Sequence, residues 1–511
     1  MKKQTILILL IVAVGLASCD DWFDVTASNE IREEEHYNTE DGFRQSLIGC
    51  YIAMGDAGLF GKNMSWYVPE LAAHQYRAFT DGSANTGEAY AIQQHRYSHA
   101  YVKPVTEGMW EQAYNVIANA NEALKFIDEK ESLFDPINFH VIKGELLAIR
   151  AYMHFQLLRL YGYGNWNSRA SELNAKYTIP YVTELDKNMT PQATGAEALS
   201  FILTDLSNAA SLLKDYDPVT GALDWSAYDK VNEDGFYKTR NFHLNYYAVR
   251  ALQAQVYMWK GNPESKVEAL KAAEEIIKAT GDGVEKTYTS TDNTITNVYV
   301  LKFLDTGTLQ APNYSMTPEA LFALSVQGLD TKTNSYIKPY YQGDDYLAFY
   351  LEREDGENLY ENQTSDIRFN TLLQLNTSTS TVGYVPLKLY QSTSMNYYYK
   401  NKVPLIRLPE IYYIAAECYA TGATPDLDLA MKRLNTVREK RGLYTSLENL
   451  SADEIQKEIQ KEYRKEFLSE GVMFYYFKRT GAISIPRMDD MGDDDYVFPY
   501  PDFEIQSGRV Q

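Results

Sequence analysis

The sequence is poor in cysteine, histidine and positive charge. Its 511 residues include three cysteines and seven histidines, and 48 basic residues face 69 acidic ones, so the formal net charge is −21 at pH 7. This acidic excess argues against a nucleic-acid partner and against docking on an anionic membrane surface, because both need basic side chains. Two of the cysteines, Cys50 and Cys418, lie in apolar helical settings that predict buried thiols, with a disulfide between them left open.

The motifs of common enzyme and cofactor sites are also missing. Residues 55–62 have the wrong glycine spacing for a P-loop, and no Gly-x-Ser-x-Gly or His-Glu-x-x-His motif occurs. His95 and His99 are one helical turn apart, but no third ligand is evident, so no metal site is predicted. The acidic run 489–495 could hold a structural calcium ion, but it lacks the EF-hand spacing and is interpreted as a solvated loop. No cofactor and no catalytic residue is expected.

Long apolar runs are confined to the beginning of the chain. Lys2 and Lys3 precede an apolar run of about eleven residues, which suits a secretory signal and is too short to span a bilayer. The small residues before Cys19 resemble a bacterial lipobox. We therefore predict that residues 1–18 are a removed signal peptide and that Cys19 is lipidated, with an ordinary signal cut elsewhere as the alternative. Loss of Lys2 and Lys3 changes the net charge from −21 to −23.

Helical periodicity is abundant in the rest of the sequence. Apolar residues recur at three- and four-residue steps and predict paired antiparallel helices at 109–161, 194–280 and 404–471. Thr194 and Ser451 begin capping boxes, and Asn262 followed by Pro263 predicts another helix start. From 282 to 400 the helical period is lost, which indicates loops with minor strands. The acidic, proline-containing end of the chain is expected to contain no helix.

Several stretches, in this order, resemble the SusD/RagB family of outer-membrane nutrient-binding lipoproteins. They are SCDDWFDV, WEQAYNVIANANEAL, GELLAIRAYMHFQLLRLYG, IRLPEIYYIAAECYA, YRKEFLSEGVMFYYFKR and FPYPDFEI. The resemblance implies a mainly α fold in which tetratricopeptide-like helix pairs form a superhelix beside a loop-rich lobe with minor β-structure. Met473 and Tyr476 depart from the family pattern, which usually has an arginine and an aspartate at these positions.

The resemblance also implies a division of the chain. Residues 1–18 would be the signal peptide, 19–280 an N-terminal SusD-like region with helix pairs, 281–400 a loop-rich insert, and 401–511 a C-terminal SusD/RagB region. Members of the family act as a lid over a TonB-dependent, SusC-like barrel transporter and most often bind glycans. We therefore expect a glycan-binding lipoprotein that is anchored in the outer membrane through Cys19, faces the exterior, and is not an enzyme. A peptide-binding member of the family and a glycan-degrading enzyme are the alternatives.

The 42 tyrosines suit the recognition of sugars or peptides, although most of them must belong to the core. Aromatic and polar residues occur together outside the helical period at 66–101 and 336–350, and the family takes its ligand contacts from the corresponding loops. Packing within loops is the alternative role for each candidate. The predicted ligand-binding residues are Trp66, Tyr76, Arg77, Arg96, Tyr97, Tyr101, Tyr340, Tyr341 and Tyr346.

Overall fold

The computed structural model describes residues 35–82, 84–185, 189–232, 235–281, 283–289, 295–339, 348–377 and 383–510. Cys19, the predicted signal peptide and the candidate residues Tyr340, Tyr341 and Tyr346 lie outside this part of the chain. The fold is mainly α, as predicted, with short strands between the helices. No helix in the described ranges combines the length and apolar character needed to cross a membrane.

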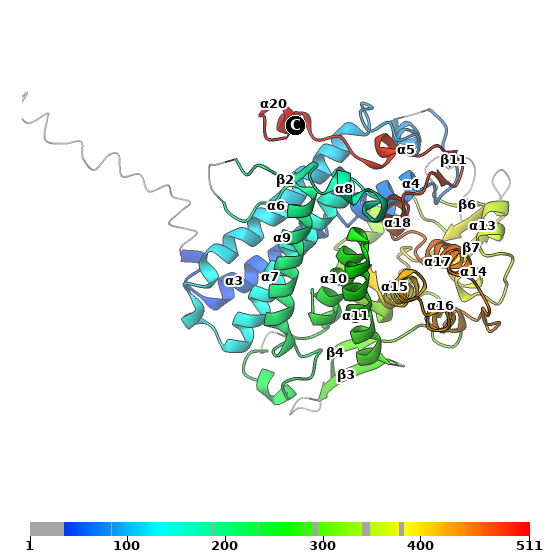
Figure 1. The fold of residues 1–511 in the computed structure, drawn as a ribbon. Coiled ribbons are helices and arrows are strands. Elements are labelled where there is room, and N and C mark those ends of the chain that lie inside the picture. The colour runs from blue at the N-terminus through cyan, green and yellow to red at the C-terminus, as the bar shows by residue number, and fades with distance from the viewer. Residues whose placement is uncertain are drawn as a thin grey trace, which may run out of the picture.

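Long helices run across the molecule and pack against their neighbours in chain order, from α6 through α7, α9, α10 and α11 to α15 and α16 (Figure 1). The predicted helix pairs are therefore confirmed. Their bounds are α3 Glu40–Met54, α6 Lys103–Ile127, α7 Pro136–Tyr161, α9 Gly195–Lys214, α10 Tyr246–Lys260, α11 Pro263–Thr280, α15 Leu408–Thr421, α16 Leu427–Lys440 and α17 Ala452–Glu466.

Local sequence signals set these helix boundaries. Thr194 and Ser451 each complete a capping box, in which the side chain accepts from the backbone N–H three residues on. The Asn262 side chain likewise accepts from the Ser265 N–H at the start of α11. Gly144 lets α7 approach α9 closely, because a Cβ at this position would lie 2.9 Å from Leu213 Cγ.

Shorter elements fill the remaining described segments. The helical ones are η1 Asn63–Tyr67, α4 Val68–Ala72, α5 Ala84–Gln93, η2 Glu131–Leu133, α8 Trp166–Leu173, η3 Trp225–Tyr228, η4 Arg240–Phe242, η5 Thr317–Glu319, α12 Leu329–Thr333, α13 Arg353–Leu359, α14 Ile367–Asn370, α18 Val472–Thr480, α19 Asp493–Tyr496 and α20 Asp502–Gln506. The expectation of no helix at the end of the chain was wrong, since α19 and α20 lie there. Each has only four or five residues, too few to show a helical period.

Within the described ranges, the strands form five small antiparallel sheets. Most of them lie in or beside the 282–400 region, where minor strands were expected. The paired strands are β1 Tyr177–Pro180 with β2 Gln192–Thr194, β3 Val284–Thr289 with β4 Ile295–Leu301, β5 Ala320–Ser325 with β9 Lys402–Arg407, β8 Gly383–Pro386 with both β6 Leu351–Glu352 and β7 Leu373–Asn376, and β10 Ser484–Ile485 with β11 Met488–Asp489.

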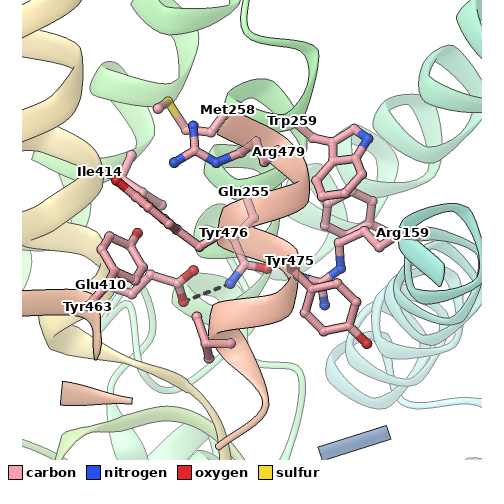
Figure 2. A pocket seen from close by; sticks show the side chains of 12 residues that line it. Arg159, Gln255, Met258, Trp259, Glu410, Ile414, Tyr463, Tyr475, Tyr476 and Arg479 are labelled. Atoms are coloured by element: carbon pink, nitrogen blue, oxygen red, sulfur yellow. Dashed lines mark hydrogen bonds between the residues drawn. The ribbon is translucent and has the colours of Figure 1, made fainter. Parts of the chain in front are cut away.

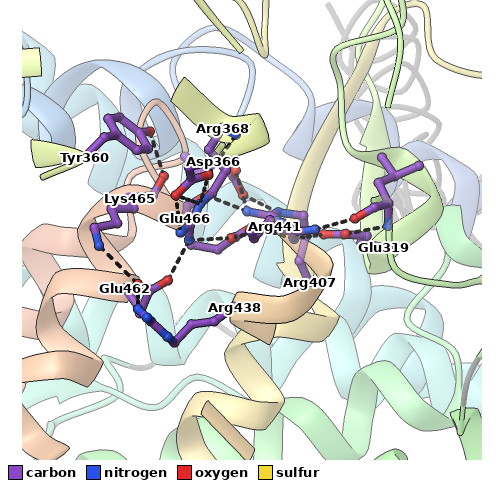
Figure 3. Close-up of polar contacts among 12 residues, drawn as sticks. Glu319, Tyr360, Asp366, Arg368, Arg407, Arg438, Arg441, Glu462, Lys465 and Glu466 are labelled. Atoms are coloured by element: carbon purple, nitrogen blue, oxygen red, sulfur yellow. Dashed lines mark hydrogen bonds and ion pairs between the residues drawn. The ribbon is translucent and has the colours of Figure 1, made fainter. Parts of the chain in front are cut away.

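A fully buried cluster of charged side chains, here called the Glu466 cluster, joins α14, β9, α16 and α17 (Figure 3). The Glu466 carboxylate accepts hydrogen bonds from Arg407 Nη1 at 2.7 Å, from Arg441 Nε and Nη2 at 2.9 Å each, and from Arg368 Nη1 at 3.1 Å. Bonds of this kind are about twice as strong as neutral ones. The cluster consists of Glu319, Asp366, Arg368, Arg407, Arg441, Glu462 and Glu466.

The two described cysteines are buried and unpaired, as free thiols in the core. Burial raises the pKa of both Cys50 and Cys418 to about 12, so neither forms a thiolate near neutral pH. The prediction of buried thiols is confirmed.

Candidate ligand-binding site

The two stretches predicted to bind ligand meet in a cluster of aromatic rings. Tyr76 and Phe349 stack with ring centroids 4.5 Å apart, and Trp66 contacts Tyr336 edge-on at 5.5 Å. The structure thus brings the 66–101 and 336–350 stretches together. Trp66 and Tyr76, however, are 0% and 1% exposed, so they support this region from beneath and present no free ring face to solvent.

Arg77 joins the same two stretches through both its backbone and its side chain. Its backbone N–H donates to the Tyr350 carbonyl at 2.7 Å, and its Nε donates to the Ala348 carbonyl at 3.1 Å. The guanidinium lies 4.3 Å from the Phe79 ring centroid and 5.1 Å from that of Tyr350. These contacts fix the position of the half-buried Arg77 side chain beside the aromatic cluster.

The other described candidates lie around α5. Tyr97 is buried, and its hydroxyl donates to the Asp495 carbonyl at 2.6 Å. Arg96 is exposed, 5.6 Å from the Tyr90 ring centroid, and Tyr101 is 44% exposed beside the His99 ring. Of this group, Arg96 and Tyr101 are therefore the exposed side chains, and Tyr97 is buried.

A pocket of about 570 Å³ adjoins the aromatic cluster and is lined by residues of α13, α17 and the β10–β11 hairpin. We call it the α13–α17 pocket. Its volume falls in the range typical of small-molecule sites. It is lined by His74, Gln75, Tyr76, Leu351, Asp355, Asn358, Leu359, Glu361, Gln460, Lys461, Arg464, Phe477, Ser484, Ile485, Pro486 and Arg487.

Arg487 holds three walls of this pocket together. It occupies the turn of the hairpin with φ +63°, a left-handed conformation that is uncommon for a side chain of this size. Its Nη1 donates to Asp355 Oδ2 at 2.9 Å, and its Nη2 donates to the His74 carbonyl at 2.8 Å and also to the Tyr76 carbonyl. The 74–76 loop, α13 and the hairpin are thereby fixed relative to one another.

The side chains around the pocket suit hydroxyl-rich ligands. Asn358 and Gln460 are exposed amides, each able to donate and to accept hydrogen bonds. Burial lowers the pKa of His74 to about 4, so its ring adds no charge at pH 7. Sequence reasoning missed the α13, α17 and hairpin residues, because polar residues on an amphipathic helix are usually solvated and only the fold brings these three elements together.

A small cavity of about 40 Å³ lies between α18 and the helices α7, α10, α15 and α17 (Figure 2). Gln255 Nε2 donates to Glu410 Oε2 at 2.8 Å, whereas Arg159 Nε, Trp259 Nε1 and Tyr475 OH have no hydrogen-bond partner within the described residues. Polar cavities of this size hold ordered water. The cavity is too small for a sugar ring, so it is not the ligand site.

The histidines and the acidic run considered for metal binding have protein partners. His95 Nε2 lies 2.8 Å from the Ala72 carbonyl, and its Nδ1 lies 3.3 Å from Asp495 Oδ1. Asp493 accepts from Arg169 Nη1 at 2.7 Å. Across the described ranges, no group of three or more histidine, cysteine, aspartate or glutamate side chains is arranged to hold a metal ion.

Two family models match the chain. The model described as "Starch-binding associating with outer membrane" matches residues 61–258, and the model described as "SusD family" matches residues 227–506. Two curated SusD-like proteins of Formosa agariphila are 22% identical over 165 residues and 23% identical over 210 residues. These matches cover 32% and 41% of the chain, and the chain spans 31% and 37% of the length of those relatives.

Solved structures share the fold over nearly the whole chain. A SusD superfamily protein from Bacteroides thetaiotaomicron superposes with a TM-score of 0.64 at 21% identity, covering 93% of this chain and 99% of that one. A SusD-like carbohydrate binding protein from Bacteroides vulgatus superposes with a TM-score of 0.65 at 15% identity, covering 92% of this chain and 96% of that one. At these identities the likeness concerns the fold.

Proposed function

The chain belongs to the SusD family, and from this membership we propose that it binds oligosaccharides in the α13–α17 pocket and does not cleave them. The observation that carries the proposal is the pocket of about 570 Å³, lined by amide and charged side chains, beside the junction of the two candidate stretches. Sugar hydroxyls need planar polar partners, which Asn358 and Gln460 supply. The carbohydrate-binding description of the Bacteroides vulgatus structure supports the same ligand class.

Titration calorimetry with a panel of neutral and acidic oligosaccharides tests this proposal. We expect saturable binding of at least one of them and unchanged oligosaccharides after long incubation, as judged by chromatography. The double variant Asn358→Ala/Gln460→Ala should bind about 30-fold more weakly, since truncation at a binding hot spot costs ~2 kcal/mol.

The matched control is the double variant Arg96→Ala/Tyr101→Ala, which removes the two exposed candidates near α5. If the control loses binding and the pocket variant does not, the site lies at α5. Cleavage of an oligosaccharide would favour the enzyme alternative, and binding of neutral or basic oligopeptides alone would favour the peptide-binding one.

We further propose that Cys19 carries a lipid anchor and that the protein faces the cell exterior, where it delivers its ligand to a SusC-like, TonB-dependent barrel transporter. The family description, which concerns association with the outer membrane, supports the location. The LASC sequence before and at Cys19 supports the anchor. One lipid chain alone gives only reversible membrane binding, so the anchor would need more than one.

Fractionation of cells that express Cys19→Ala tests this arrangement. The parent protein is expected in the outer-membrane fraction, accessible to protease added outside the cells, and co-purifying with a large barrel protein in mild detergent. The variant is expected in the soluble fraction. A variant that stays in the membrane contradicts the anchor, and recovery of the parent chain alone contradicts the partner.

A further inference from the structure

We propose that the α13–α17 pocket recognises an anionic group on the sugar, a carboxylate or a sulfate ester, through Arg464. This inference rests on the proposed function and narrows its ligand class to acidic oligosaccharides. It begins from Arg464, a cation that makes no ion pair within the described ranges of this strongly acidic protein.

Arg464 differs from the other cations around it. Its Nε is buried and, within the described part of the chain, has no hydrogen-bond partner, and the guanidinium makes no ion pair there. Its helix neighbours are paired: Lys461 Nζ lies 3.0 Å from Glu361 Oε1, and Lys465 Nζ lies 3.1 Å from Glu462 Oε1. A half-buried guanidinium without such a partner is costly unless a ligand supplies the missing charge.

The two carboxylates of the pocket lining do not form an ion pair with Arg464, because both are paired with other cations. Asp355 lies near Arg464 and partly offsets its charge, but it is held by Arg487 Nη1 at 2.9 Å. Glu361 is shared between Lys461 at 3.0 Å and Lys465 at 2.5 Å. The pocket lining therefore carries the three cations Lys461, Arg464 and Arg487 against two carboxylates.

The surroundings of Arg464 favour an incoming anion. Burial first, and then the charge of Arg487, lower the pKa of Arg464, so both disfavour its charged form. A bound carboxylate or sulfate would offset both effects. The guanidinium also presents a planar fork of donors that matches these oxyanions, which a lysine does not offer.

The rest of the pocket suits the sugar that carries the anion. The exposed Asn358 and Gln460 amides, on α13 and α17, both line the pocket and can bind hydroxyls next to the charged group. Arg487 stiffens the pocket wall through its hydrogen bonds to Asp355 and to the His74 carbonyl. The volume of about 570 Å³ accommodates a sugar residue as well as its anionic group.

The test compares matched charged and uncharged ligands on the full mature chain by titration calorimetry. The probes are oligogalacturonates and their methyl esters, oligomannuronates, sulfated galactan oligosaccharides with desulfated counterparts, and a tetraglutamate peptide. We expect at least one acidic oligosaccharide to bind at least tenfold more tightly than its uncharged counterpart, with an affinity that falls as sodium chloride is raised from 50 to 500 mM. Whether the uronates or the sulfated sugars bind identifies the source of the anion.

Variants then assign the contact to Arg464. Arg464→Met should lose at least tenfold in affinity for the acidic ligand and little for its uncharged counterpart, whereas Arg464→Lys should lose less. The control is Arg353→Met on α13, an exposed arginine outside the pocket lining, which should change neither. Thermal melting of each variant verifies folding. If Arg464→Met does not fold, the inference is tested by the affinities of the parent protein for the acidic oligosaccharide and for its methyl ester.

Equal affinity of the parent for acid and ester, or unchanged binding of the acid by a folded Arg464→Met, overturns this inference and leaves the proposed function standing. An equal loss for acidic and uncharged ligands in Arg464→Met also overturns it, since that would be a structural effect. Absence of binding to every oligosaccharide, or binding of tetraglutamate alone, overturns both proposals.

Discussion

Replacing Glu466 with glutamine is expected to lower the free energy of unfolding by about 3–5 kcal/mol, because breaking a buried ion pair leaves uncompensated charge in the core. Glu466 accepts from three guanidinium groups, those of Arg368, Arg407 and Arg441. An amide has one acceptor oxygen and would turn its N–H groups toward further donors. The arginines would then keep their desolvation cost without the carboxylate that offsets it.

Urea unfolding followed by circular dichroism measures this loss. The matched control is Glu357→Gln, since Glu357 pairs with Arg353 at 2.8 Å on the surface, where an ion pair contributes about 1 kcal/mol or less. The midpoint of Glu466→Gln should fall well below those of the parent and the control. A midpoint equal to that of the control would show that the Glu466 cluster contributes no more than a surface pair.

Stability is also expected to fall steeply in acid, by roughly 3 kcal/mol for each strongly paired buried carboxylate between pH 5 and pH 2. Burial alone would raise the pKa of Glu462, but Arg368 and Lys465 lower it to about 2. Burial would likewise raise the pKa of Glu145, but the neighbouring Arg240 and His243 outweigh it and lower the pKa of Glu145 to about 2. A lowered carboxyl pKa contributes stability that is complete above the unfolded value near 4.5 and is lost as the pH falls toward 2.

Glu70 changes the pH dependence of stability in the opposite direction, because its pKa is raised. Burial raises its pKa to about 7, so its contribution is complete below pH 4.5 and is lost as the pH rises through 7. Because the Glu70 contribution declines between pH 4.5 and pH 7 while the other two are complete above pH 4.5, these groups together predict maximal stability near pH 5. Urea midpoints at pH 3, 5, 7 and 9 test this, and Glu462→Gln should show a smaller difference between pH 5 and pH 3 than the parent. Equal parent midpoints at pH 3 and pH 5 would contradict it.

The long helices could be predicted from the sequence because each one shows a helical repeat of apolar residues and local signals for its ends. The capping boxes at Thr194 and Ser451 are local signals, read within four residues, and the structure places helix starts at both. The Glu466 cluster was not accessible in this way. Arg407 and Glu466 are 59 residues apart, and in a chain with 48 basic and 69 acidic residues nothing local identifies which charges become buried.

The candidate site was accessible only in outline. Composition identified two stretches that the structure joins through the Tyr76–Phe349 and Trp66–Tyr336 contacts. It did not separate buried rings from exposed ones, because a segment without helical period can still be covered by other parts of the chain. Trp66 and Tyr97 are such cases, whereas Tyr101 is exposed. The domain boundaries at 19–280, 281–400 and 401–511 stay predictions.

The two faces of α17 have different roles, one in the core and one in the pocket lining. Its inner face carries Glu462 and Glu466 in the Glu466 cluster, and its outer face carries Gln460 and Arg464 in the pocket. Because the inner residues hold the helix backbone rigidly, a ligand meets outer side chains whose backbone is already ordered, and binding pays little conformational entropy there. If the pocket binds sugars as proposed, substitutions on the outer face of α17 would change ligand preference without disturbing the fold.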